Sequence, residues 1–183
     1  MIRHLPNLLS ALRLLAAPVA AWAILEDHDT LALTLFVAAS FSDAADGFIA
    51  RRWGFTSQFG AWLDPIADKL LMLSCFLALW LAEAVPLWLA ALVIARDLGI
   101  AGGALLAKLC GLPLKIAPLA IGKATTAVLA VFVGARLLLL AFDIEAPHYV
   151  TAGSYTAAAF ILLSGAVYAL VFLKLLFGGR HAA

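Results

Sequence analysis

The sequence contains six long apolar segments separated by short polar connections, and this pattern constrains the fold more than any other feature. A helix needs about 20 mainly apolar residues to cross the hydrocarbon layer of a membrane. Because 66% of the 183 residues are hydrophobic and only 13% are charged, an ordinary soluble domain, which is about 25% charged, is excluded. We predict an all-α, polytopic membrane protein, a single domain over residues 1–183 built as a bundle of six transmembrane helices. The six segments are residues 7–25, 31–50, 62–82, 86–107, 116–142 and 150–176.

The distribution of charge predicts the orientation of these helices. If the helices alternate in direction, one side carries seven basic residues outside or near the ends of the segments, namely Arg3, Arg51, Arg52, Lys108, Lys115, Lys174 and Arg180. The opposite connections carry no Lys or Arg, only the acidic residues Glu26, Asp27, Asp29, Glu83, Asp143 and Glu145. Cytoplasmic loops are enriched in Lys and Arg. We therefore expect both termini in the cytoplasm and the protein in a bacterial inner membrane. The net charge of +1 gives no electrostatic argument for a nucleic-acid partner.

The first apolar segment is similar to a secretory signal, but Arg13 interrupts it and five further segments follow, so we expect no cleavage. The two cysteines, Cys75 and Cys110, lie in or beside apolar stretches and lack metal-ligand spacing. We expect both to be reduced and to behave as small hydrophobic residues.

Four aspartates lie inside the second and third apolar segments. Asp43 and Asp46 come near the end of one segment, and Asp64 and Asp68 near the start of the next. An ionised aspartate in a membrane helix costs about 2.5–3.5 kcal/mol on insertion scales, so such residues are usually functional or paired. Residues three or four apart share a helix face. The short connection makes the two helices antiparallel neighbours, so we expect the four carboxylates to converge near the cytoplasmic surface.

Four neighbouring carboxylates repel one another and become protonated unless cations lie between them. Lys69 and Arg51 are too few to satisfy eight oxygens. Ligation by oxygen alone is typical of Mg²⁺, Mn²⁺ or Ca²⁺. We therefore predict that the four aspartates hold Mg²⁺ or Mn²⁺, as a pair of ions able to clamp a diphosphate. The alternative, aspartates merely solvated by the cytoplasm, is less favoured for four residues at these spacings.

The spacing of these residues resembles the complete signature of the CDP-alcohol phosphatidyltransferases, Asp43-x2-Asp46-Gly47-x2-Ala50-Arg51-x8-Gly60-x3-Asp64-x3-Asp68. The opening Pro6-Asn7-Leu8-Leu9-Ser10, with Arg13, and the six apolar segments are also similar to this family. The resemblance implies a metal-dependent transfer of a phosphatidyl group from CDP-diacylglycerol to an alcohol, with release of CMP. It also implies a homodimer in the lipid bilayer.

The resemblance further implies roles for individual residues. Asp43, Asp46 and Asp64 would be metal ligands. Asp68 would be both a metal ligand and the general base on the acceptor hydroxyl. The cytidine diphosphate site would be lined by Gly47, Ala50, Arg51 and Gly60, with Asn7 contributing from the first segment.

Arg96, Asp97 and Lys123 are charged residues deep in the predicted helices, and they bear on the acceptor. They predict either a small basic pocket beside the carboxylates, with Arg96 and Lys123 binding substrate, or a structural ion pair that ties helices together. Phosphatidylglycerophosphate synthases, which use glycerol 3-phosphate, usually carry more cations at these places. The single Arg-Asp pair resembles the CMP-forming cardiolipin synthases more closely. Phosphatidylglycerol is therefore the predicted acceptor, and glycerol 3-phosphate is the alternative.

Two other classes stay open. An intramembrane prenyltransferase would show two Asp-rich motifs far apart in the chain, whereas a cation transporter would show an internal repeat or a broken helix. Among the remaining residues, Arg136 is expected to be structural, by snorkelling or pairing. The glycines at positions 99, 103, 153 and 165 are expected to pack helices together.

Overall fold

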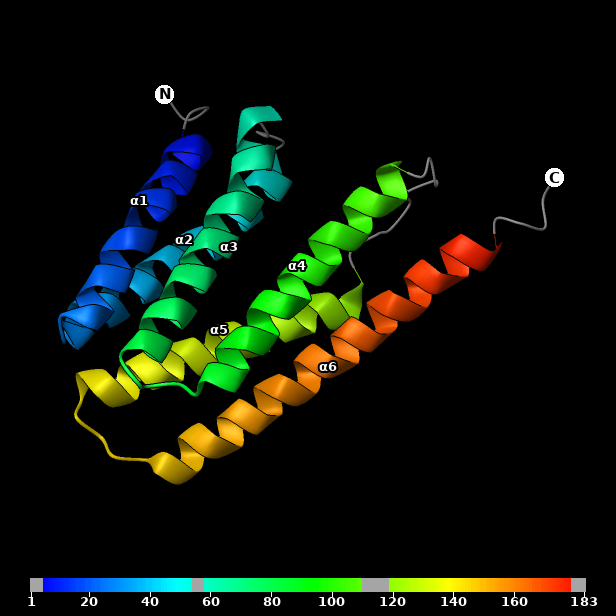
Figure 1. The fold of residues 1–183 in the computed structure, drawn as a ribbon. Coiled ribbons are helices and arrows are strands. Elements are labelled where there is room, and N and C mark those ends of the chain that lie inside the picture. Colours follow the sequence, from blue (N-terminus) through cyan, green and yellow to red (C-terminus); the bar gives the residue numbers. More distant parts are fainter. Residues whose placement is uncertain (1–4, 54–57, 110–118, 179–183) are drawn as a thin grey trace. The chain divides into compact units, whose positions relative to one another are not determined.

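The structure is a computed structural model that describes the backbone of residues 5–53, 58–109 and 119–178 and the side chains of residues 11–42, 66–109 and 119–174. Within these ranges all regular secondary structure is helical, which confirms the predicted all-α class. Each predicted segment corresponds to one helix. The helices are α1 (Leu5–Leu25), α2 (Asp29–Trp53), α3 (Gln58–Leu81), α4 (Leu87–Leu109), α5 (Ala120–Ala141) and α6 (Pro147–Gly178) (Figure 1).

The described helices divide into two compact units. The first unit consists of α1, α2, α3 and the part of α5 from Val133 onward. The second consists of α4, the part of α5 up to Phe132, and α6.

In the first unit, α1 packs against both α2 and α3. The buried positions of α1 include Ala17, Ala20 and Ala23, each fully shielded from solvent. Ala67 and Cys75 on α3 are also fully buried. Cys75 is a free thiol, as expected. Cys110 lies outside the described residues. Small side chains let helix backbones approach closely. Helix α1 thereby holds α2 and α3, the two helices that carry the aspartates, in one unit.

Three helices of the first unit end with the same turn. Asp27, Glu83 and Asp143, which follow α1, α3 and α5, have positive φ angles of 57°, 55° and 52°. In each turn the next backbone N–H donates a hydrogen bond of 2.8 Å to a carbonyl five residues earlier, namely His28 to Ala23, Ala84 to Leu79 and Ile144 to Leu139. Glycine is the usual residue at this left-handed position. These turns fix where each helix stops.

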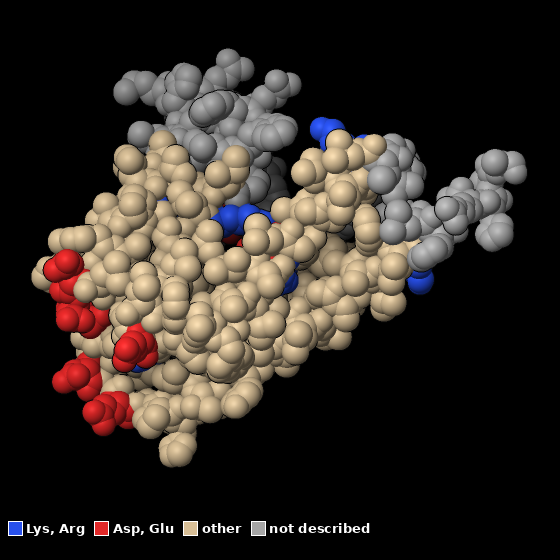
Figure 2. Space-filling view, in the orientation of Figure 1, with Lys and Arg blue, Asp and Glu red and all other residues tan. Residues whose placement is uncertain are grey.

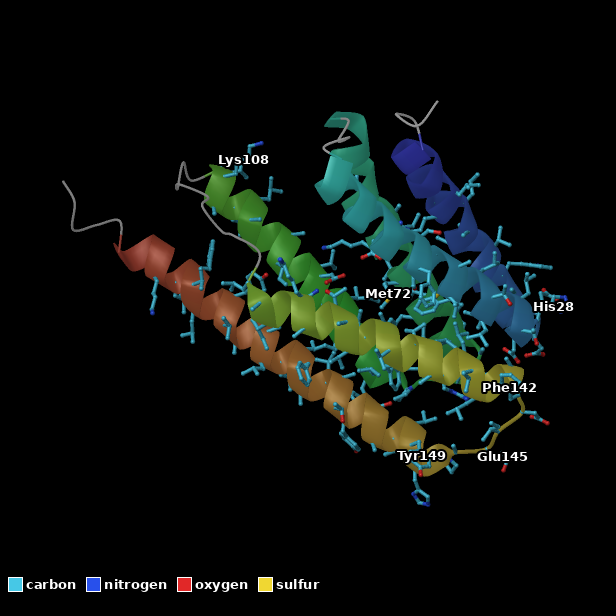
Figure 3. All side chains as sticks on the ribbon, turned by 180° about the vertical axis from the view of Figure 1, so that it is seen from behind. His28, Met72, Lys108, Phe142, Glu145 and Tyr149 are labelled. Atoms are coloured by element: carbon cyan, nitrogen blue, oxygen red, sulfur yellow. The ribbon has the colours of Figure 1, made fainter. Side chains whose placement is uncertain are left out.

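The acidic connections of the first unit gather at the end that these turns form (Figure 2). Figure 3 shows His28, Phe142 and Glu145 at the same end.

Arg136 lies on α5, and its Nε donates a hydrogen bond of 2.8 Å to the carbonyl oxygen of Ala84, which confirms its predicted structural role. Partial burial raises the pKa of Asp29, which precedes the predicted span 31–50; the neighbouring Asp27 raises it further, and Arg136 opposes both effects.

In the second unit, α4 packs against α6, and the two helices run in the same direction (Figure 1). The ring of Trp88 in the first turn of α4 stacks on the ring of Tyr155 in the third turn of α6, with centroids 5.5 Å apart. Thr125 Oγ1 donates a hydrogen bond of 3.2 Å to the carbonyl oxygen of Phe160, which joins α5 to α6.

Three of the described helices are long and apolar enough to cross a membrane: α4, α5 and residues Pro147–Lys174 of α6. The parts of α1 and α2 with described side chains, Ala11–Leu25 and Asp29–Ser42, are apolar but shorter. The chain is therefore an integral membrane protein, and passage of all six helices through the bilayer stays a prediction.

Candidate active site

The four signature aspartates lie on two helices of the first unit. Asp43 and Asp46 are in the last turns of α2, and Asp64 and Asp68 are in the first turns of α3. The Asp68 side chain is half-buried. The other three carboxylates lie outside the described side chains, as do the predicted nucleotide-site residues Asn7, Gly47, Ala50, Arg51 and Gly60.

The backbone register places the two pairs of aspartates at matching depths. Asp43 precedes the last residue of α2, Trp53, by ten positions, and Asp68 follows the first residue of α3, Gln58, by ten positions. At a rise of about 1.5 Å per residue, Asp43 lies roughly 15 Å from the end of α2, and Asp68 lies the same distance from the start of α3. Because α2 also contacts α3, this register favours the predicted convergence of the carboxylates.

The metal site itself stays a prediction. Among the described side chains, no three His, Cys, Asp or Glu residues form a group that could hold a metal ion. Asp68 is the only member of the predicted quartet within that set. The ligands are therefore assigned by the residue pattern and the helix register.

Arg13, part of the opening that resembles the family, is a buried cation in the same unit. It lies on α1, and only 2% of the residue is exposed. A buried charge in an apolar helix is costly and is normally kept where polar groups stabilise it. The signal available in the sequence was an arginine in the middle of an apolar segment.

In the second unit, Arg96 and Asp97 form an ion pair between adjacent residues of α4, so the pair does not tie two helices together. Arg96 Nη1 lies 2.7 Å from Asp97 Oδ1, and the two side chains are 10% and 32% exposed. Arg96 Nη2 also donates a long hydrogen bond of 3.4 Å to the carbonyl oxygen of Gly122 on α5. The Lys123 side chain is exposed. Its role in substrate binding stays a prediction.

A cavity of about 730 Å³ lies between α4 and α6, and sequence reasoning did not find it. Its walls are mostly apolar, with Arg96 and the Tyr168 ring among them. The Tyr168 ring packs against Gly122, where an added Cβ would lie 2.7 Å from the phenolic oxygen. Three glycines leave the space open: Gly99 and Gly103 on α4 and Gly165 on α6.

The predicted packing role of the glycines is confirmed at Gly153 and stays a prediction at Gly99, Gly103 and Gly165. A Cβ at Gly153 would lie 2.9 Å from the Phe132 ring, so this glycine does permit close packing. A Cβ at Gly99, Gly103 or Gly165 would meet no described atom within 4 Å. Glycine allows two helices to approach closely but does not bring them together, and here α4 and α6 stay apart at these positions.

Comparison with known proteins gives the family. The family model "CDP-alcohol phosphatidyltransferase" matches residues 3–172. A protein of Drosophila melanogaster named "Probable cardiolipin synthase (CMP-forming)" is 37% identical over 113 residues, which cover 61% of this chain and 35% of that protein. The CMP-forming cardiolipin synthase of Rattus norvegicus is 34% identical over 161 residues, covering 79% of this chain and 51% of that protein.

A third relative carries a different name. The "Probable phosphatidylglycerophosphate synthase" of Mycobacterium tuberculosis is 33% identical over 168 residues, which cover 88% of this chain and 77% of that protein. The chain thus spans about a third of the first relative, about half of the second and most of the third. The matched region includes the whole Asp43–Asp68 signature and the buried Arg13. The chain belongs to the CDP-alcohol phosphatidyltransferase family.

Proposed function

We propose that this protein transfers a phosphatidyl group from CDP-diacylglycerol to an alcohol and releases CMP. The observation that carries the proposal is the family match over residues 3–172, which includes every position of the signature on α2 and α3. The family match favours this reaction over the prenyltransferase and transporter alternatives.

The residues of the signature fit a divalent cation because all four candidate ligands are carboxylates, the donor type that Mg²⁺ and Mn²⁺ prefer. Asp43, Asp46, Asp64 and Asp68 would hold the pair of ions. When bound, such ions neutralise diphosphate charge and lower the pKa of a bound hydroxyl. Asp68 accepts the proton of the acceptor hydroxyl. The hydroxyl oxygen then bonds to the phosphorus that carries the diacylglycerol, while the bond from this phosphorus to the CMP oxygen breaks, and Arg51 stabilises the charge on CMP.

We propose phosphatidylglycerol as the acceptor, so that the product is cardiolipin. Two relatives named cardiolipin synthase support this choice. The charge of Arg96 is already balanced by Asp97, and a balanced site suits a phosphodiester monoanion better than the dianion of glycerol 3-phosphate. The mycobacterial relative, named for phosphatidylglycerophosphate synthesis, supports glycerol 3-phosphate as the alternative acceptor.

The proposed enzyme spans the bilayer six times, has both termini and the aspartates on the cytoplasmic side, and forms a homodimer. The orientation is supported by Lys108 in the last turn of α4, labelled in Figure 3, and by Lys174 near the end of α6. The homodimer is supported by the family resemblance alone.

The test is a side-by-side assay of the purified full chain in mixed micelles. CDP-diacylglycerol is supplied with phosphatidylglycerol or glycerol 3-phosphate, and CMP release is measured with Mn²⁺, with Mg²⁺ and with excess chelator. We expect release with phosphatidylglycerol that requires the metal. Release with glycerol 3-phosphate alone would establish the alternative acceptor. No release with any alcohol would overturn the proposed function, and release that persists with chelator would overturn the metal site.

A further inference from the structure

Arg13 is the one charged residue among the buried side chains that the structure describes, and only 2% of it is exposed. The first unit has two other Lys or Arg residues with described side chains. Lys69 is exposed, and Arg136 donates to the Ala84 carbonyl at the end of the unit where the acidic connections gather. A buried guanidinium is costly unless acceptor oxygens surround it. The place of Arg13 in the unit therefore indicates where such oxygens are gathered.

Arg13 belongs to the buried face of α1. Buried residues follow it at intervals of three and four, at Ala17, Ala20 and Ile24, and residues at these intervals share one face of a helix. Helix α1 packs against α2 and α3 within the first unit. Because a helix turns its buried face toward its neighbours, Arg13 faces α2 and α3.

The buried faces of α2 and α3 lead to the signature aspartates. The buried residues include Ala32, Phe36 and Ala39 on α2, and Ala67, Leu71 and Cys75 on α3. Continued at the same intervals, the face of α2 reaches positions 43 and 46, and the face of α3 reaches position 64. The remaining signature residue, Asp68, follows the buried Ala67 and is itself half-buried. The faces that pack around α1 thus carry the aspartate positions.

The helix register puts Arg13 level with the aspartates. Arg13 lies 12 positions before the last residue of α1, and Asp68 lies 13 positions before the last residue of α3. Asp43 lies 14 positions after the first residue of α2. At a rise of about 1.5 Å per residue, all three are roughly 18–21 Å from the acidic end of the unit. Side chains lean toward the N-terminus of their helix, and for α1 this is the end where α2 ends and α3 begins (Figure 1).

We propose that Arg13 is a positioning residue for the metal site, whose guanidinium donates hydrogen bonds to carboxylate oxygens of the four signature aspartates and fixes the orientation in which they bind divalent cations. This inference rests on the proposed function, because it assumes that the aspartates hold metal. Arginine suits the role because its planar fork can hold two oxygens at once. Its charge also offsets part of the repulsion among neighbouring carboxylates before the cations bind.

The first measurement is Mn²⁺ binding, which needs no turnover. The full chain, freed of metal in an uncharged detergent, is titrated with Mn²⁺, and the free ion is followed by electron paramagnetic resonance. The signature site is identified as the binding that is lost in Asp46→Asn. Groups that orient metal ligands typically change metal affinity by about 10- to 100-fold, so Arg13→Met should raise the Kd for Mn²⁺ by about that factor.

Arg136→Met is the matched control, because Arg136 is also a partly buried arginine of the first unit but donates to the Ala84 carbonyl. This variant should unfold at a lower temperature and keep its Kd for Mn²⁺ within twofold of wild type, a ratio that we set as the criterion. An equal loss of Mn²⁺ affinity in both variants would show that any loosening of the unit weakens the site, and it would overturn the proposal. A folded Arg13→Met that meets the criterion would also overturn it.

Arg13→Lys keeps the test decisive if Arg13→Met does not fold. Lysine keeps the positive charge but replaces the planar fork by a single point charge. This variant should raise the Kd for Mn²⁺ by less than Arg13→Met does, but still by more than the twofold criterion. A folded Arg13→Lys within the criterion would overturn the proposed positioning of carboxylate oxygens.

Turnover separates this inference from the proposed function. If wild type releases no CMP but its Mn²⁺ affinity falls in Arg13→Met, the proposed reaction fails and the positioning role stands. If wild type releases CMP and Arg13→Met binds Mn²⁺ as tightly as wild type, the reaction stands and the positioning role fails. If wild type shows no Mn²⁺ binding that Asp46→Asn removes, the metal site and this inference fail together.

Discussion

Arg96 and Arg136 show how single cations are held within apolar helices. Arg96 uses the carboxylate of the next residue in its own helix, at 2.7 Å. Arg136 uses the backbone carbonyl of Ala84, at 2.8 Å. This carbonyl lies just beyond the end of α3, where carbonyl oxygens are not used by helical hydrogen bonds. In both cases the guanidinium donates a short hydrogen bond to an oxygen atom of the chain itself.

Asp68 carries the prediction at the scale of a single residue. Asp68→Asn keeps the size of the side chain but removes its ability to take a proton, so CMP release should fall by roughly 100- to 10,000-fold. Thermal unfolding of the purified variant should show that it still folds. Asp143→Asn changes an exposed carboxylate in the connection after α5 and should retain wild-type turnover. Normal turnover in folded Asp68→Asn would remove this residue as the base.

At the scale of the element, the ends of α1, α3 and α5 are set by local geometry. Each ends with a left-handed residue followed by a backbone hydrogen bond back into the last turn. None of the three left-handed residues is a glycine, because Asp27, Glu83 and Asp143 occupy these positions. These turns therefore store conformational strain that a substitution can relieve.

Glu83→Gly should stabilise the protein by about 0.5–1 kcal/mol, because an L-residue is strained at positive φ and glycine is not. Asp143→Gly should gain less, since aspartate tolerates this conformation better than glutamate. The measurement is thermal unfolding of both variants in the same detergent. A melting temperature below that of wild type in Glu83→Gly would contradict the argument.

At the scale of the whole molecule, orientation in the membrane follows from the separation of charge along the chain. The acidic residues occupy the connections after α1, α3 and α5, and basic residues lie near the ends of α4 and α6. Lys and Arg are retained on the cytoplasmic side during insertion. The orientation therefore depends on basic residues close to the helix ends.

A reporter fused after Ala183 tests this orientation in bacterial cells. Green fluorescent protein fused there should fluoresce, and alkaline phosphatase fused there should be inactive, because the proposed orientation puts the C-terminus in the cytoplasm. Fusion of each reporter after Asp143, in the connection between α5 and α6, should give the reverse result. Active phosphatase at the C-terminus would show that the orientation is inverted.

The number, order and approximate limits of the helices could be predicted from the sequence, because the length of an apolar run and the rise per residue are local quantities. The spacing of the aspartates from Asp43 to Asp68 led to the family for the same reason, since it is a local pattern within two helices and their connection. The structural role of Arg136 could also be predicted, but its partner, Ala84, could not.

The tertiary structure alone decided which small residues pack and which leave space. Gly153 meets the Phe132 ring, whereas Gly99 and Gly103 face a cavity, although all are glycines in apolar helices. The hydrogen bond from Arg96 to Gly122 likewise joins residues 26 positions apart. Such features depend on how closely two helices approach each other at each position along their length. That distance is set by all of the side chains between them and is not encoded in any single segment.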